Sequence, residues 1–317
     1  MGRRVQFGRY GAPDVLHVAD VPRPSAGDGQ VLVRVAAAGI NPGEIAIRSG
    51  AMEHMFPATF PSGQGSDFAG QVLEAGPGVT RFAPGDEVMG WSDTRSAQAD
   101  HVISDPQHLT AKPPALDWIR AGALWAIGVT SFSAVRAVGV QPGEVVVVSA
   151  AAGGVGGLAA QLARRAGARV LGIASPASAG RLRAIGVEPV SYGDGLADRL
   201  RSLAPGGVDA FIDTHGDGYV DLAIAIGVTP GRIDTIIDFA GAQRHGAKTD
   251  ASPQASKPEV LAMMAEHLAW GRLSMPIAAI YPLEQVREAY AELASGHVYG
   301  KIVLSTQMAA GTAPLRG

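Results

Sequence analysis

A run of valines that leads into a glycine-rich turn constrains the fold of this chain more than any other feature. Residues 144–149 (Glu-Val-Val-Val-Val-Ser) predict a buried strand, and a helical pattern over 156–166 follows the turn Ala150-Ala-Ala-Gly-Gly-Val-Gly156. A strand, a tight turn and a helix in this order are typical of a parallel, doubly wound sheet. The uncharged stretch 145–163 is therefore interpreted as these elements rather than as a membrane span.

The spacing of small residues in this turn predicts a dinucleotide-binding site, with a purely structural turn as the alternative. Read as G-x-G-x-x-G, its key positions are Ala151, Gly153 and Gly156. Gly153 allows a pyrophosphate to approach the backbone, Gly156 allows the helix to pack closely on the strand, and the helix N-terminus offers N–H groups to phosphates. An alanine in the first position requires a negative φ there. The other residues of the expected phosphate-binding turn are Ala152, Gly154 and Val155.

The segment after the next strand, 169–174, favours NADPH over NADH. An NAD-binding protein places a carboxylate near Ala174 and Ser175 for the ribose 2′-hydroxyl, but the chain has no Asp or Glu between Glu144 and Glu188. A 2′-phosphate instead requires cationic or hydroxyl donors. We expect these donors to be Ser175, Ser178 and Arg181; the alternative for nearby arginines, preferred for Arg164 and Arg165, is a solvent-facing helix surface.

A length of 317 residues suffices for about two domains. Near Trp118 the sequence changes from short β-type runs to alternating helix and strand patterns. Residues 1–110 are β-rich, with short apolar runs such as 30–37 and 70–74 between prolines and glycines. Further strands are predicted over 208–213, 232–238 and 301–305, and helices over 179–185, 258–270 and 284–294. We expect 308–317 to be a loose tail. The polar stretch 243–258 is interpreted as a solvated connection, with a mobile segment beside the cofactor as the alternative.

Composition excludes several classes of function. The chain has no cysteine, which excludes disulfides, thiol nucleophiles and Cys-ligated zinc or iron–sulfur sites. Its histidines, His297 among them, are scattered rather than arranged at metal-ligand spacing, so we expect no metal site. A net charge of −3 gives no broad case for nucleic acid or an anionic membrane. Since the first residues lack an apolar signal sequence, we expect a soluble cytoplasmic protein.

Several motifs in order along the chain resemble the zinc-free quinone oxidoreductases (zeta-crystallin-like) of the medium-chain dehydrogenase/reductase superfamily. Besides the cofactor turn, they are Gly39-Ile-Asn-Pro-Gly-Glu44, Gly65-Ser-Asp-Phe-Ala-Gly70, Phe82-x-Pro-Gly-Asp-Glu-Val88, Gly128-Val-Thr130 and Gly296-His-Val-x-Gly-Lys-Ile-Val-Leu304. The resemblance implies an α/β protein with a GroES-like, β-rich substrate domain (1–120 with 265–317) and a Rossmann NADPH-binding domain (121–264). It also implies a homodimer that reduces a small-molecule quinone or α,β-unsaturated carbonyl.

The resemblance also assigns roles to individual positions. It places Asn41 near the nicotinamide and substrate, and Thr130 near the cofactor. Tyr192 is implied to help hold the 2′-phosphate. The loops Thr214–Gly216, with His215, and Phe239-Ala240-Gly241 are implied to flank the nicotinamide. The chain departs from the family pattern in two ways: Glu44 replaces an aspartate, and Ala46 and Met52 stand where some relatives have tyrosines.

The absence of a zinc site narrows the expected chemistry. Without a Lewis acid, hydride transfer requires an electron-poor acceptor such as a quinone or a conjugated enone. We expect Asn41 to be a neutral hydrogen-bond donor near the acceptor oxygen. Asp67 is a second catalytic candidate, although a buried carboxylate that caps backbone N–H groups fits it equally well. Two other functions remain open: an enoyl (double-bond) reductase of a biosynthetic pathway, and a catalytically weak NADPH-binding structural or sensor protein.

Overall fold

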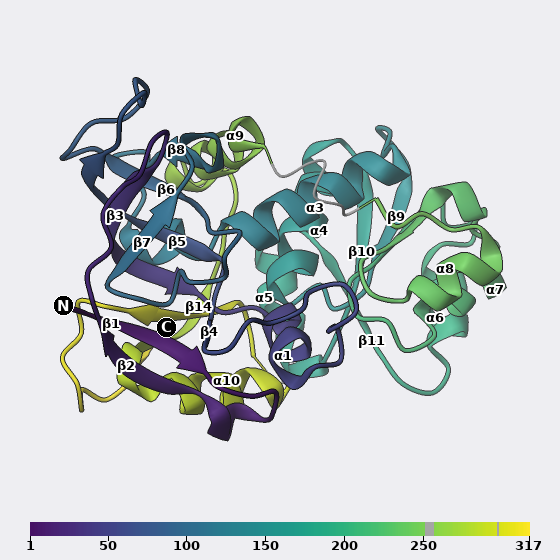
Figure 1. Cartoon of the computed structure of the whole chain (residues 1–317). Helices are drawn as coiled ribbons and strands as arrows, with labels where there is room; N and C mark the ends of the chain where they lie inside the picture. The colour runs from purple at the N-terminus through teal and green to yellow at the C-terminus, as the bar shows by residue number, and fades with distance from the viewer. Residues whose placement is uncertain (251–256, 297) are drawn as a thin grey trace. The chain divides into compact units, whose positions relative to one another are not determined.

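The computed structural model describes residues 1–250, 257–296 and 298–317, so His297 and part of the polar stretch 243–258 lie outside the described residues. The chain divides into two compact units. Unit 1 comprises Met1–Ala126, Lys257–Trp270 and Pro276–Gly317, and unit 2 comprises Ile127–Ser256 and Gly271–Met275. Figure 1 labels helices and strands of the chain and colours them from purple at the N-terminus to yellow at the C-terminus. The domain boundaries predicted from the sequence lie at 120/121 and 264/265.

Unit 2 is built on a parallel sheet whose strand order is β11-β10-β9-β12-β13. This order starts at a central strand and extends to each side in turn, which confirms the predicted doubly wound fold. The strands are β9 (Val145–Val148), β10 (Arg169–Ala174), β11 (Glu188–Ser191), β12 (Ala210–Asp213) and β13 (Ile233–Thr235). The helices are α3 (Trp125–Val138), α4 (Gly154–Arg165), α5 (Ala179–Ala184), α6 (Leu196–Leu203), α7 (Tyr219–Ala225) and α8 (Phe239–His245), with 3-10 turns η3 (Pro176–Ser178) and η4 (Pro230–Arg232).

Burial on both faces explains why the central strand β9 is uniformly apolar. Val146 and Val148 pack in a cluster with small residues of α3 and α4. Val147 points to the other face, where it packs in a cluster with Leu200 of α6 and Val220 of α7. Side chains alternate between the faces of a strand, so a strand covered on both sides must be apolar at every position.

Unit 1 has a long mixed sheet, of order β16-β14-β15-β3-β5-β6-β8 with β7 also paired to β3, and a small antiparallel sheet, β2-β1-β4. The strands are β1 (Gly2–Phe7), β2 (His17–Val21), β3 (Val31–Gly39), β4 (Ser62–Gly63), β5 (Asp67–Ala75), β6 (Glu87–Trp91), β7 (His101–Ser104), β8 (Leu109–Ala111), β14 (Ile277–Pro282), β15 (Lys301–Ser305) and β16 (Leu315–Arg316). The helices are α1 (Pro42–Ser49), α2 (Trp118–Ala121), α9 (Pro258–Ala269) and α10 (Val286–Ala294), with 3-10 turns η1 (Pro13–Val15), η2 (Pro106–His108) and η6 (Leu283–Gln285).

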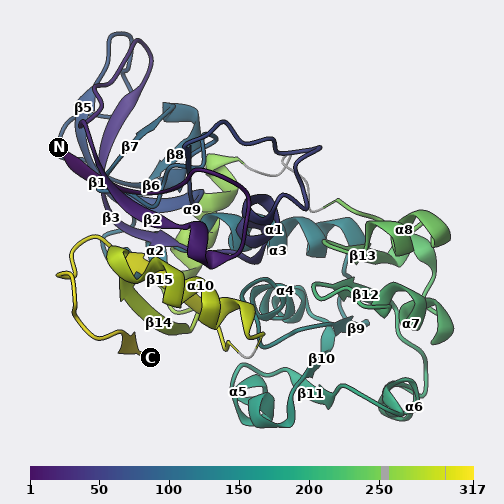
Figure 2. The same ribbon diagram turned by 60° about the horizontal axis from the view of Figure 1, so that its bottom comes forward.

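The two ends of the chain build one core in unit 1. Helix α10 lies against β14 and β15, as Figure 2 shows. Its residues Val286, Ala289 and Tyr290 share a buried cluster with Phe7 of β1 and Ile302 of β15. Strand β15 pairs antiparallel with β3, so the C-terminal segment completes a sheet that the N-terminal segment begins.

Two sequence predictions for the fold are wrong. The tail 308–317 is not uniformly loose, because β16 pairs with β14 and Arg316 is bound to Glu292. The predicted strand 232–238 is limited to β13, because the Asp238 side chain instead accepts the Gly241 N–H and starts α8. Strand β13 gains a short parallel bridge to Lys248 at its outer edge. Local residue propensities do not reveal the pairing of β16 with β14 or the bridge between β13 and Lys248.

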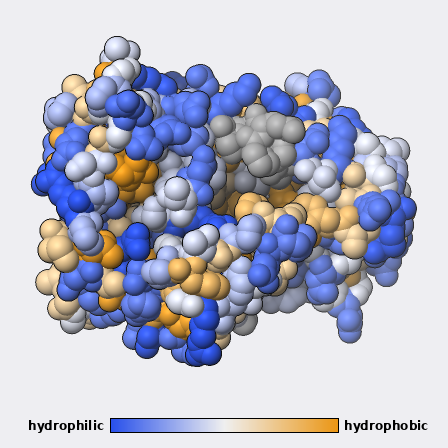
Figure 3. All heavy atoms as spheres, viewed as in Figure 1, coloured by the Kyte–Doolittle hydropathy of each residue, from blue (hydrophilic) through white to orange (hydrophobic). Residues whose placement is uncertain are grey.

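Hydrophilic side chains cover most of the face drawn in Figure 3, with hydrophobic patches between them. Within the described ranges, no helix combines the length and apolar character that crossing a bilayer requires.

Candidate functional site

The turn between β9 and α4 has the geometry that phosphate binding requires. Gly153 is the N-cap of α4, with φ −81° and ψ 179°. A Cβ on Gly156 would lie 2.4 Å from the Ala150 carbonyl oxygen, so only glycine lets α4 pack this closely on β9. The first-turn N–H groups of a helix have no acceptor within the helix. Those of Gly154, Val155 and Gly156 therefore form a cradle that fits a pyrophosphate.

The left-handed residue of this turn is Ala150, with φ 44°, and not Ala151. Ala151 is not among the residues with a positive φ, which confirms the prediction for the first motif position. Its side chain is fully buried. The Ala150 carbonyl accepts the Gly153 N–H at 2.8 Å, which closes the turn. No residue pattern indicates that the alanine before the motif adopts this unusual conformation.

The residues predicted to hold a 2′-phosphate gather at the carboxyl edge of β10 and β11. These parallel strands pair Ala174 with Ser191, so Ser175 and Tyr192 follow at the same edge. Ser175 Oγ lies 3.2 Å from Ser178 Oγ, and Tyr192 is 53% exposed. Arg181 lies in α5 just beyond these serines.

A cation that the sequence analysis missed also serves this edge. The Arg199 guanidinium donates to the main-chain carbonyls of Ser191, Tyr192, Gly193 and Asp194. These bonds fix the loop that carries Tyr192 while they leave a positive charge beside it. The sequence contains no signal for this role, because an arginine a few residues after a strand is a common pattern.

Asp213, at the end of β12, fixes a third segment at the carboxyl edge of the unit 2 sheet, after the β9–α4 turn and the residues that follow β10 and β11. We refer to these segments together as the cofactor edge. It is fully buried. Its Oδ1 accepts hydrogen bonds from Ser149 Oγ at 2.7 Å and from the N–H groups of His215 and Gly216 at 3.0 Å. Its Oδ2 accepts Thr235 Oγ1 at 2.8 Å, so one carboxylate ties together the ends of β9, β12 and β13. The loop 214–216 is therefore rigidly placed.

The remaining predicted cofactor residues lie on helices of unit 2. Phe239, Ala240 and Gly241 form the first turn of α8 rather than a loop, because Asp238 caps this helix. Phe239 is 54% exposed. Thr130 lies half-buried within α3.

The catalytic candidates lie together in unit 1 around Asn41, the N-cap of α1. The Lys301 ammonium donates to Asn41 Oδ1 at 2.5 Å and to the Ile40 carbonyl at 2.7 Å. Asn41 Nδ2 donates to Glu44 Oε1 at 3.3 Å, and the Asn41 N–H donates to Glu44 Oε2 at 2.9 Å. Both ends of the amide thus contact charged groups of the protein.

Glu44 serves mainly as a structural carboxylate. It is 6% exposed, and it also accepts the Ser66 N–H at 3.2 Å and the Tyr290 hydroxyl at 2.5 Å. The same hydroxyl accepts hydrogen bonds from Gln98 at 2.7 Å and Gln64 at 2.9 Å. The longer side chain of a glutamate is what allows this contact with α10 from the third position of α1.

Asp67, the first residue of β5, is fully buried. Burial raises its pKa to about 7, and Glu44 adds to this rise, while Lys301, Asn41 and the Ala126 N–H act in the opposite direction. Its Oδ2 accepts that N–H, in the first turn of α3, at 3.4 Å, whereas its Oδ1 has no partner among the described residues. The carboxyl therefore keeps its proton below about pH 7. It touches a helix N-terminus rather than its own Gly-Ser-Asp-Phe segment.

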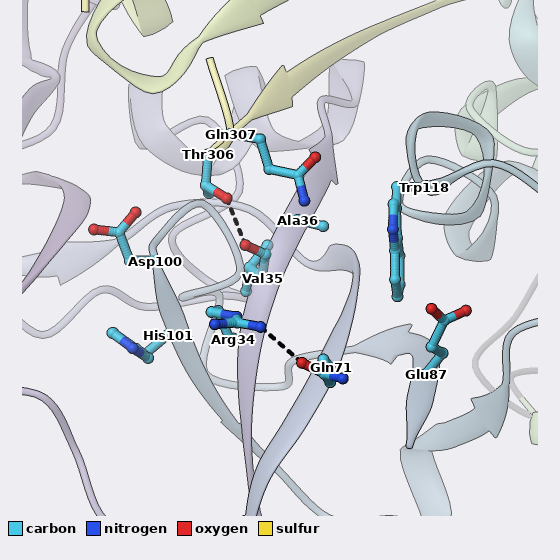
Figure 4. A pocket seen from close by; sticks show the side chains of 10 residues that line it. All are labelled: Arg34, Val35, Ala36, Gln71, Glu87, Asp100, His101, Trp118, Thr306 and Gln307. Atoms are coloured by element: carbon cyan, nitrogen blue, oxygen red, sulfur yellow. Dashed lines mark hydrogen bonds between the residues drawn. The ribbon is translucent and has the colours of Figure 1, made fainter. Parts of the chain in front are cut away.

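A separate hollow of about 570 Å³ lies on the sheet of unit 1 (Figure 4). Its polar walls bind one another or their neighbours: Arg34 donates to Gln71 at 2.7 Å, and Asp100 pairs with Arg3 at 2.7 Å. It contains none of the predicted site residues. Within the parts of the chain that are described, no group of three His, Cys, Asp or Glu side chains is placed to hold a metal ion.

Comparison with known proteins agrees with both folds. Residues 27–110 match the alcohol dehydrogenase GroES-like domain, and residues 185–304 match the zinc-binding dehydrogenase domain. A quinone oxidoreductase of Pseudomonas aeruginosa is 31% identical over 96% of this chain and 99% of its own. The chain belongs to the quinone oxidoreductase family of medium-chain dehydrogenases/reductases. The predicted GroES-like and Rossmann folds and the oxidoreductase class of this family member are thereby confirmed.

Two further relatives bear on this quinone oxidoreductase family member. The structure of Escherichia coli quinone oxidoreductase complexed with NADPH superimposes with a TM-score of 0.85 at 24% identity, covering 96% of this chain and 99% of that one. The spectinabilin polyketide synthase system protein NorB of Streptomyces orinoci is 30% identical over 95% of this chain, which spans 14% of that protein. The family binds a nicotinamide cofactor, and the turn at Gly153–Gly156 fits one.

Proposed function

We propose that the protein is an NADPH-dependent reductase of quinones or α,β-unsaturated carbonyls. The observation that carries this proposal is the carboxyl edge of the unit 2 sheet. There the α4 N-terminus offers N–H groups to a pyrophosphate, and hydroxyl groups follow β10 where an NAD-binding protein would place a carboxylate.

The roles of the cofactor residues follow from these positions. Ala152 to Gly156 bind the pyrophosphate, and Ser175, Ser178, Arg181 and Tyr192 bind the 2′-phosphate. His215 and the first turn of α8, with Phe239, Ala240 and Gly241, flank the nicotinamide end, and Thr130 contacts the cofactor. When bound, a reduced nicotinamide supplies a hydride.

The protein's own part in the reaction lies with Asn41 and Asp67. The Asn41 amide keeps its oxygen on Lys301, so its NH2 group is the side that can donate. Its bond to Glu44 Oε1 is long, at 3.3 Å, and is the one that an acceptor oxygen replaces. The reduced product requires one proton in addition to the hydride, and Asp67 holds a proton below about pH 7.

The test is NADPH oxidation, followed by nicotinamide absorbance, with 1,4-benzoquinone, an ortho-quinone and a simple alkyl enone, each repeated with NADH. We expect turnover of the quinones and a preference for NADPH. Tight NADPH binding with no turnover of any acceptor would contradict the proposal and favour a binding or sensor protein.

An enoyl reductase is the second candidate, and the similarity to a polyketide synthase protein over 95% of this chain favours it. The two functions share the cofactor edge and differ in the acceptor. Turnover of thioester-linked enones with no turnover of quinones would select this second function.

A further inference from the structure

The proposed function names Lys301 only as the partner of the Asn41 oxygen and assigns it no role of its own. It begins β15 and is only 4% exposed. Burying an ammonium group is costly unless hydrogen bonds and opposite charges compensate it. Burial indeed lowers the pKa of Lys301, while the nearby Asp67 and Glu44 carboxyls act in the opposite direction.

The partners of Lys301 determine which way the Asn41 amide faces. Nζ carries only donors, so the atom 2.5 Å away on Asn41 must be the amide oxygen. A flipped amide would place NH2 against the ammonium and its oxygen against Glu44 Oε1, which accepts from Nδ2 in the observed orientation. Both contacts of the flipped amide would be unfavourable, so the cation and the carboxylate select the same orientation.

Arg48, a buried cation within α1, does not orient the Asn41 amide. Arg48 lies 1% exposed, with its guanidinium 4.9 Å from the centre of the Tyr290 ring, and its Nε faces the Gly11 carbonyl at 3.4 Å. Its charge supports Tyr290 and the Glu44 side of the cluster rather than the Asn41 oxygen.

We propose that Lys301 is a positioning residue that holds the Asn41 side-chain oxygen inside unit 1 and leaves the Asn41 NH2 group as the donor toward the acceptor. The part of this inference that concerns the reaction rests on the proposed function. The part that concerns the amide orientation rests on the hydrogen bonds alone.

The kinetic test compares K301M with K112M. Methionine is an unbranched side chain close to lysine in length, and it has neither the charge nor the donors. Lys112 is a matched control, since it is 7% exposed in the same unit and donates to the Pro113 and Leu116 carbonyls at 3.1 and 2.8 Å. We expect K301M to lower kcat with quinones about 100-fold, as a misplaced group does, with the KM for NADPH within about twofold. K112M is expected to keep its kcat even where it loses stability.

A double variant separates positioning from general damage. If Lys301 acts through Asn41, then N41A and N41A/K301M will have the same kcat. Multiplicative losses in the double variant, or a wild-type kcat in K301M, would overturn the proposal. Should K301M fail to fold, K301Q retains an N–H donor without charge, and we expect it to keep kcat within about tenfold of wild type. A K301Q variant that folds but loses kcat by more than that would also count against positioning through this hydrogen bond.

A measurement without turnover keeps the two proposals distinguishable. The Asn41 side-chain NH2 signals in ¹⁵N NMR should move in K301M and stay in place in K112M. Signals unchanged in K301M would refute the orientation argument whatever the enzyme turns over. If the signals shift in K301M but the wild-type protein fails to oxidise NADPH with any of the tested acceptors, the proposed function is refuted. The Lys301–Asn41 contact is then still supported.

Discussion

The Tyr290 hydroxyl donates a hydrogen bond of 2.5 Å to Glu44 Oε2 across 246 positions of sequence. Both groups are buried, so Y290F would remove one hydrogen bond from Glu44 Oε2 and the buried acceptor of the Gln64 and Gln98 amides. We expect Y290F to lower the free energy of unfolding by about 1–3 kcal/mol, measured by urea denaturation. E44Q should cost a similar amount, and E44Q/Y290F should cost less than the sum of the two.

Y281F is the control for this pair. The Tyr281 hydroxyl also binds a carboxylate, Glu292, but that side chain is 24% exposed and also pairs with Arg316. Since Arg316 and water can satisfy Glu292, we expect Y281F to cost under about 1 kcal/mol. Equal losses in Y281F and Y290F would show that the Glu44 contact has no special weight.

Asp67 predicts a particular dependence of stability on pH. Its folded pKa of about 7 lies above the ordinary value of 3.8, so between these limits the folded state holds a proton that the unfolded state has released. The free energy of unfolding should therefore fall as pH rises from about 4 to about 7, with a slope of up to about 1.4 kcal/mol per pH unit. D67N should remove the part of this fall that Asp67 contributes, most visibly between about pH 6 and 7, as urea denaturation at a series of pH values would reveal.

Asp234 in unit 2 provides the comparison, because burial raises its pKa to about 6. D234N should flatten the curve only below about pH 6 and leave the fall between 6 and 7. If D67N leaves that upper part unchanged, Asp67 is not the group that titrates there.

Gly153 offers a substitution that separates cofactor binding from folding. Aspartate is a favourable N-cap residue, and the extended backbone at Gly153 suits it. We therefore expect G153D to keep the unfolding midpoint within a few degrees. Its carboxylate would repel a pyrophosphate, so NADPH binding, measured by fluorescence titration, should be lost. Unchanged NADPH affinity in a folded G153D would exclude the α4 N-terminus as the phosphate site.

The left-handed conformation of Ala150 predicts a stabilising substitution. An alanine at φ 44° costs roughly 1 kcal/mol relative to glycine, so A150G should raise the free energy of unfolding by about that amount. A151G is the matched control. Ala151 is fully buried beside Gly172, so loss of its methyl group should destabilise the protein. A destabilised A150G would contradict the strain at this turn.

The cofactor edge was largely predictable because its signals are local. A valine run, a glycine turn and the missing carboxylate after 169–174 lie within about 30 residues, and the structure places them at one sheet edge. The serines at 175 and 178 meet for the same reason. The start of a helix at Phe239 was not predictable in this way, because it depends on a cap by Asp238. The apolar pattern of 232–238 predicts that Asp238 belongs to a strand.

The surroundings of Asn41 were not predictable in the same way. Asn41 and Asp67 were selected from their motifs, but Lys301 and Tyr290 reach them only through the pairing of β15 with β3 and the packing of α10. A lysine after a glycine near the C-terminus has no local mark of burial. Nothing in one sequence indicates that such a charge meets a residue 260 positions earlier.

The split origin of unit 1 has a consequence for how the protein is made. Unit 2 is nearly continuous, and residues 127–256 leave the ribosome together, so its parallel sheet can form while translation proceeds. Strand β3 meanwhile lacks its neighbour β15 until residue 305 has been synthesised. The nascent N-terminal segment therefore exposes the unpaired edge of β3 until β15 is available. A truncated product that ends before Lys301 would keep this edge exposed and would also lack the lysine that binds Asn41.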